Sequence, residues 1–134
     1  MKPIKKPNDP VEPTRSELEI LQVLWKHGPS TVRFVNDHLN EQKREVQYTS
    51  TLKLMQIMVE KGLLTRDAST RTHVYEAKLP QDQTQRLLVA DLVDRAFGGS
   101  AAALVMQALS ARPVTAEQLK EIRQLIKEEE ESRK

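Results

Sequence analysis

Five polar residues near the middle of the chain have side chains that could hydrogen-bond to another molecule. The stretch VQYTSTLK, residues 46–53, contains Gln47, Tyr48, Thr49, Ser50 and Lys53. An amide can pair with an adenine edge, hydroxyls can bond base edges or phosphates, and a lysine can meet a phosphate or a guanine. Hydroxyls at a helix start also occur as simple caps, so the cluster alone admits both interpretations.

The residues that follow this polar cluster are spaced as one face of a helix. A buried stripe is predicted from the i, i+3, i+4, i+7 spacing of Thr51, Leu54, Met55 and Met58. The helix should run to about Lys61, with its polar start exposed and its stripe held in a core, as base reading requires. Leu52 and Ile57 fall off the stripe, and they either contact thymine methyl groups or pack under the hairpin that follows.

Two further helices and a hairpin are predicted around this helix. PTRSELEILQVLWKHGP has Thr14 or Ser16 as a cap, and STVRFVNDHLNEQ has Ser30 or Thr31, each followed by apolar residues at helical spacing. After Gly62, β-rich runs at 63–67 and 72–79 flank a turn. Three short helices and a two-stranded ribbon form a winged helix-turn-helix. We therefore expect residues 14–80 to bind DNA, with Thr31, Arg33 and the wing residue Arg71 positioning it. The residues expected to read the bases are Gln47, Tyr48, Thr49, Ser50 and Lys53.

The charge distribution favours the same part of the chain as the anion-binding surface. The formal net charge is +2, and residues 1–80 carry 13 Lys/Arg against 10 Asp/Glu, whereas residues 81–134 carry 8 against 9. Residues 1–13 hold four of the seven prolines and few apolar residues, which is typical of a flexible arm.

Residues 81–134 show three helical patterns with apolar sides. An appendage of this size cannot bury three apolar faces alone, so pairing with a second copy is the simplest solution, although the helices could also close over their own domain. A homodimer would read a palindromic site and pool the phosphate contacts of two winged domains. The expected dimer contacts are Leu88, Leu92, Phe97, Leu104, Val105, Leu109, Leu119, Ile122, Leu125 and Ile126.

Several functional classes lack the residues that they need. The chain has no cysteine, its three histidines show no metal-ligand spacing, and neither a GxSxG elbow nor a GxxxxGK[ST] loop occurs. No apolar run approaches the roughly 20 residues of a membrane helix. We expect a cytoplasmic protein that is not an enzyme and uses no metal or other cofactor. The remaining alternatives are a winged helix used for protein contact and a ligand-sensing regulator.

The span from about Pro13 to Glu128 resembles the penicillinase repressor family, bacterial regulators of β-lactamase, methicillin-resistance and copper-transport genes. The resemblance is carried by SELEILQVLWKHGPSTVRFV, VQYTSTLKLMQIMVEKGLLTR, HVYEA and FGGSAAALVMQAL. It implies a mainly α protein with a small β-hairpin, namely an N-terminal winged helix-turn-helix and a C-terminal three-helix dimerisation domain over residues 81–134. It also implies a homodimeric repressor on a palindromic operator.

The resemblance further implies a route of induction. In the antibiotic-responsive members, a membrane-bound sensor protease detects a β-lactam, and the repressor is cut in its dimerisation domain between an Asn and a Phe. Those positions match Gln107 and Ala108 here, where a methyl group replaces the aromatic ring. The copper-responsive members bind metal through a cysteine-rich C-terminal motif, which this chain lacks.

Overall fold

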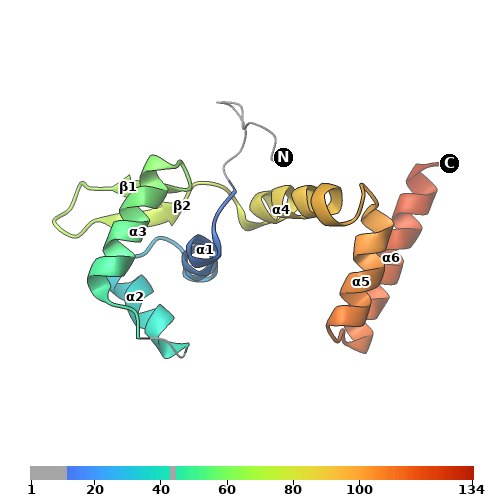
Figure 1. Ribbon diagram of the computed structural model, residues 1–134, viewed down its shortest axis with the longest axis horizontal. Helices are drawn as coiled ribbons and strands as arrows, with labels where there is room; N and C mark the ends of the chain where they lie inside the picture. The colour runs from blue at the N-terminus through green and yellow to red at the C-terminus, as the bar shows by residue number, and fades with distance from the viewer. Residues whose placement is uncertain (1–11, 43–44) are drawn as a thin grey trace. The chain divides into compact units, whose positions relative to one another are not determined.

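The computed structural model describes residues 12–42 and 45–134, and helices dominate it (Figure 1). The elements are α1 (Arg15–His27), α2 (Val32–Glu41), α3 (Tyr48–Glu60), β1 (Leu64–Asp67), β2 (Val74–Ala77), α4 (Gln81–Ala96), α5 (Ala101–Ala111) and α6 (Ala116–Ser132). The predicted fold class, mainly α with a small β-hairpin, is confirmed. The chain forms two compact units, one ending at Val89 and one beginning at Ala90. Residues 1–11 of the predicted arm lie outside the described residues.

Hydroxyl caps fix the starts of the first two helices. Of the predicted alternatives, Thr14 rather than Ser16 caps α1, in a capping box with Glu17. Thr31 rather than Ser30 caps α2, accepting a 3.2 Å hydrogen bond from the backbone N–H of Phe34. Gly28 ends α1 with φ +82°, a backbone conformation that residues with a Cβ rarely adopt.

The hairpin is joined to the helices by a backbone bridge. β1 and β2 pair antiparallel, with Leu64 opposite Ala77 and Asp67 opposite Val74, so both strands are shorter than the predicted runs. Ser30, which precedes α2, exchanges two backbone hydrogen bonds of 2.9 and 2.8 Å with Tyr75 of β2. This bridge holds the start of α2 beside the hairpin.

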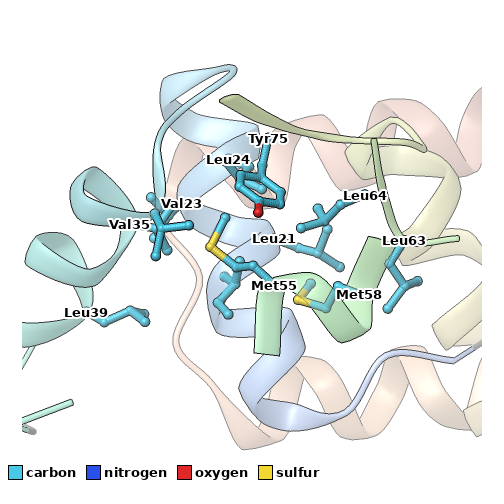
Figure 2. Packing of buried hydrophobic residues seen from close by; sticks show 12 residues of the cluster. Leu21, Val23, Leu24, Val35, Leu39, Met55, Met58, Leu63, Leu64 and Tyr75 are labelled. Carbon is cyan, nitrogen blue, oxygen red and sulfur yellow. The ribbon is translucent and has the colours of Figure 1, made fainter. Parts of the chain in front are cut away.

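The core of the first unit lies between the three helices and the hairpin (Figure 2). The predicted stripe of α3 supplies Thr51, Met55 and Met58, which are buried, and Leu54, which is half-buried. The largest fully buried side chain is Tyr75, at 1% exposure, which brings β2 into the core. Leu52 packs against this core, whereas Ile57 remains 38% exposed.

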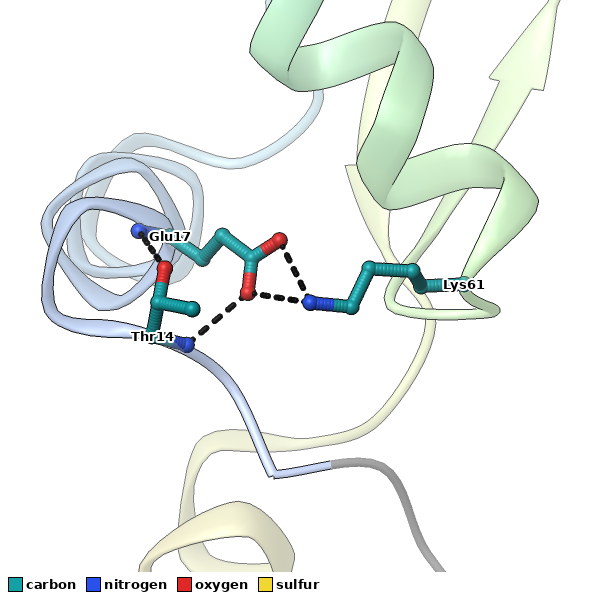
Figure 3. Close-up of polar contacts among 3 residues, drawn as sticks. All are labelled: Thr14, Glu17 and Lys61. Carbon is teal, nitrogen blue, oxygen red and sulfur yellow. Dashed lines mark hydrogen bonds and ion pairs between the residues drawn. The ribbon is translucent and has the colours of Figure 1, made fainter.

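An ion pair with a buried carboxylate joins the first and third helices (Figure 3). The Lys61 Nζ lies 2.9 Å from both carboxylate oxygens of Glu17, whose side chain is 2% exposed. Burial tends to raise the pKa of Glu17, but the backbone hydrogen bond from Thr14 and the bond and charge of Lys61 outweigh it, and its pKa is lowered.

The last helices are well capped and poorly buried. Ser100 caps α5, and Thr115 forms a capping box with Gln118 at the start of α6. None of the residues of α5 or α6, all of which the structure describes, is buried. Across the described parts of the chain, every helix is too short or too polar to cross a membrane.

Candidate nucleic-acid interface

The start of α3 is exposed and polar, as the sequence predicts. Gln47 is its N-cap residue, and within the described structure its side chain makes no capping hydrogen bond. Tyr48, Thr49 and Ser50 follow in the first turn, all exposed. These hydroxyls are therefore not the N-cap of the helix, and the capping interpretation does not account for them.

The exposed residues of α3 point in different directions. Thr49, Lys53 and Gln56 are exposed at i, i+4 and i+7, so they share one helix face, turned away from the buried Met55. Ser50 lines a cavity beside Ser16 of α1, on a flank of the helix. Gln56 is not among the residues that the sequence predicts to bind DNA, although its spacing places it on the same helix face as Thr49 and Lys53.

Two asparagines of α2 hold the turn that leads into α3. Asn36 is 3% exposed, and its Nδ2 donates to the Val46 carbonyl and to the Thr51 hydroxyl, both at 2.9 Å. The Asn40 Oδ1 accepts a 2.6 Å hydrogen bond from the Val46 N–H. These bonds fix the polar start of α3 against α2, because the buried amide has its partners only in this arrangement.

The three residues predicted to position the DNA line one cavity together with Tyr48, which is predicted to read it. Thr31, Arg33 and Tyr48 line a cavity of about 280 Å³ together with Arg71 of the wing. The guanidinium carbon of Arg33 lies 4.5 Å from the centre of the Tyr48 ring, in cation–π contact. Among the described residues that line this cavity, the permanently charged ones are Arg33 and Arg71, and none is a carboxylate. We call it the arginine cavity.

The tip of the wing is ordered by short local hydrogen bonds. The backbone N–H of Ser69 donates to the Asp67 carboxylate at 2.9 Å, and the Thr70 hydroxyl donates to the Thr72 carbonyl at 2.7 Å. Hydrogen bonds from the Ser69 side chain and backbone lower the pKa of Asp67. This turn presents Arg71 to the arginine cavity, whereas Arg66 is exposed on β1.

The histidines do not form a metal centre of three or more ligands in the described residues. The sequence separates His27 from His38, but the structure brings their rings to 4.5 Å between centroids, both beside Phe34. His73 lies apart from them and lines the arginine cavity.

The predicted dimer residues form an exposed apolar set. Leu92, Val105, Leu125 and Ile126 are 48%, 43%, 60% and 48% exposed. Leu109 and Leu119 are also exposed, and the half-buried members are Leu88, Phe97, Leu104 and Ile122. Gln107 and Ala108 are exposed in the middle of α5. So much uncovered apolar surface is typical of an interaction face.

Comparisons with known proteins agree with this architecture. A penicillinase repressor family model matches residues 13–128. The penicillinase repressor of Bacillus licheniformis is 25% identical over 125 residues, which cover 89% of this chain and 92% of that protein. The solved complex structure of hsRosR-S4 is similar in fold, with a TM-score of 0.51 and 15% identity over 92% of this chain and 94% of that chain. Because the family model spans most of the sequence, this chain belongs to the penicillinase repressor family.

Proposed function

We propose that this protein represses transcription by occupying a palindromic operator as a homodimer. The observation that carries the proposal is the joint placement of the exposed polar start of α3 and the arginine cavity in one unit. A repressor must reach the chromosome, so we place it in the cytoplasm. Membership of the penicillinase repressor family supports the same function.

In this proposal, α3 enters the major groove and its outward face reads the bases. Gln47, Thr49 and Lys53 contact base edges or the adjacent backbone, and Gln56 extends the same face by one turn. Ser50 bonds a neighbouring phosphate from the flank of the helix. Around the arginine cavity, Thr31, Arg33, Tyr48 and Arg71 hold the phosphate backbone and thereby set the register of α3 on the duplex.

The dimer is formed by apolar residues of the second unit together with Leu88 at the end of the first. Because α5 and α6 bury none of their own residues, they need a partner surface, and a second copy supplies a matching one through two-fold symmetry. The contacts are the ten residues that the sequence predicts, from Leu88 in α4 to Ile126 in α6. Pairing doubles the phosphate contacts, which matters because each chain has a net charge of only +2.

Induction acts through the dimer surface. A cut between Gln107 and Ala108 would divide α5 and separate α6 from the rest of the chain, and a membrane-bound sensor protease would cause this cut directly or through another protease. The bond lies inside a helix, Ala101–Ala111, so α5 must open locally before a protease can bind it as an extended segment.

Footprinting of the purified protein on its own upstream region, combined with transcription from that promoter, tests the proposal. We expect protection of one two-fold symmetric sequence and loss of transcript at the same protein concentrations. Protein capture without DNA protection would favour a protein-contact module. Release of the DNA by a small molecule, with the chain left intact, would favour a ligand-sensing regulator.

A further inference from the structure

Two histidine rings from different helices meet in the first unit, and the proposed function gives them no role. His27 is the last residue of α1 and is exposed, and the half-buried His38 lies in the last turn of α2. The centroids of the two rings lie 4.5 Å apart, and both rings also contact Phe34, at 5.3 Å from His27 and 4.2 Å from His38. The spacing along the chain carries no signal of this pair, because the two histidines meet only through the packing of α1 against α2.

The hydrogen bonds of the two rings leave imidazole nitrogens available for a ligand. The Nδ1 of His38 lies 3.1 Å from the carbonyl oxygen of Phe34. A carbonyl only accepts, so Nδ1 carries the hydrogen, and the Nε2 of the neutral ring keeps its lone pair. The His27 ring makes ring contacts but no hydrogen bond to another described residue. Histidines that bind metal ions have the arrangement seen at His38, in which one nitrogen donates to a backbone carbonyl and the other binds the ion.

The connection between α1 and α2 fixes the spacing of the two rings. Gly28 ends α1 with φ +82°, Ser30 is bridged to Tyr75 of β2, and Thr31 caps α2. A metal–nitrogen distance of 2.0–2.1 Å places two imidazole centroids bound to one tetrahedral ion about 5 Å apart. The observed 4.5 Å is close to this separation, so a small rotation of the exposed His27 side chain brings both rings onto one ion.

The electrostatics at this place favour a cation. Both histidines lie in the last turn of their helices, where the unpaired carbonyls form the negative end of the helix dipole. Imidazole is a ligand for zinc, nickel and copper ions, whereas magnesium and calcium ions prefer oxygen ligands.

We propose that His27 and His38 form a two-histidine site for a divalent transition-metal ion of the zinc, nickel and copper class. His38 binds the ion through Nε2, and His27 binds it through one nitrogen of its exposed ring. The described residues offer no group of three His, Cys, Asp or Glu side chains, so water completes the coordination and the ion exchanges with solvent. The ion links the end of α1 to α2 and stabilises the first unit, because the unfolded chain does not hold the two rings together. Neither histidine lines the arginine cavity, and the site does not depend on the proposed function.

Calorimetric titration of the metal-free, full-length protein with Zn²⁺ tests the site. We expect one ion per chain, and His27→Gln and His38→Gln should each lower the affinity at least about tenfold, because each removes one of the two protein ligands. His73→Gln is the matched control and should bind Zn²⁺ as the wild type does, because His73 lies in the arginine cavity. Mg²⁺ should not compete. An equal affinity in wild type, His27→Gln and His38→Gln would overturn the proposal, as would the absence of Zn²⁺ binding.

A second measurement identifies the nitrogens that hold the ion. NMR of the ring nitrogens during Zn²⁺ addition should show a saturable shift of His38 Nε2 and of one His27 nitrogen, while His38 Nδ1 stays protonated and the His73 resonances stay unchanged. In parallel, Zn²⁺ should raise the thermal unfolding midpoint of the wild type and of His73→Gln, but not that of His27→Gln. If the His38 Nε2 resonance does not move at saturating Zn²⁺, the pair does not hold the ion and the inference is wrong.

Discussion

The guanidinium of Arg33 lies over the ring of Tyr48, 4.5 Å from its centre, and so joins the first turn of α2 to the first turn of α3. We expect this contact to hold Arg33 in position for a phosphate. Tyr48→Leu, which removes both ring and hydroxyl, should weaken duplex binding by about 1–2 kcal/mol. Tyr48→Phe keeps the ring and should lose less. Equal losses in the two variants, measured by fluorescence anisotropy, would show that the ring contact contributes nothing.

Lys53 and Ser50 lie three residues apart on α3 but line different surfaces. Lys53 is on the outward face, so Lys53→Ala should weaken operator binding by about 1–3 kcal/mol if it meets a base, and should act uniformly across sequences if it meets a phosphate. Ser50 lies on the flank of the helix, so Ser50→Ala should change the difference in binding free energy between operator and random duplex by less than about 0.5 kcal/mol. Titration of both variants against operator and random duplex separates these cases. If Lys53→Ala binds both duplexes as tightly as the wild type does, Lys53 does not contact the DNA.

The elements were predictable from the sequence to the extent that their signals are local. The stripe from Thr51 to Met58 and the apolar side of α1 follow from helical spacing, and the hairpin follows from composition around a turn. Asn36 bonding Thr51, and Ser30 bridging Tyr75, join residues far apart in the chain and carry no such signal. The same holds for Arg71, because only tertiary packing brings this wing residue to the cavity that Arg33 of α2 also lines.

The ion pair between Glu17 and Lys61 should contribute measurably to stability. Lys61→Met would leave the Glu17 carboxylate buried without its cation and should lower the free energy of unfolding by about 1–3 kcal/mol. The loss is modest because the Lys61 side chain is 32% exposed, so water partly screens its charge. Urea denaturation followed by circular dichroism gives the value. Glu60→Gln, at the neighbouring exposed position, is the control and should have little effect.

The same pair predicts an acid-labile part of the stability. The pKa of Glu17 is lowered in the folded protein from its ordinary value of 4.5, so the unfolded chain takes up this proton first as pH falls. The stabilisation is therefore complete above about pH 4.5 and is lost as pH falls through the lower folded value. Unfolding curves between pH 7 and pH 3 should show this loss in wild type and a smaller loss in Lys61→Met. Identical pH profiles of wild type and Lys61→Met would show that the ion pair with Lys61 is not the cause of this loss.

Leu125 should report on the dimer without disturbing the first unit. Its side chain is 60% exposed within one chain, so Leu125→Glu removes no internal contact of importance but places a charge in the proposed interface. We expect a monomer by sedimentation and a duplex affinity at least tenfold weaker, because the phosphate contacts of two domains are no longer pooled. Lys127→Glu changes the charge on another side of α6 and should stay dimeric. If Leu125→Glu remains a dimer, Leu125 does not lie in the interface.

Proteolytic induction predicts a fragment of defined mass. Cells in which the regulated promoter has been induced should contain an N-terminal fragment that ends at Gln107, detectable by mass spectrometry of the tagged protein. Ala108→Pro alters the bond and should suppress the fragment, and Ser132→Ala at the end of α6 should not. Induction of transcription with the chain intact would exclude proteolysis as the route of release.

The stoichiometry and the salt dependence of operator binding test most directly whether this protein is a dimeric repressor. Purified protein is titrated with fragments of its own upstream region over a range of salt, and the mass of each complex is measured. We expect two chains on one palindrome, with an affinity that falls steeply as salt rises, because two sets of phosphate contacts release counterions. Equal affinity for every fragment and for random duplex, or a complex with a single chain, would contradict a dimeric repressor that reads an operator.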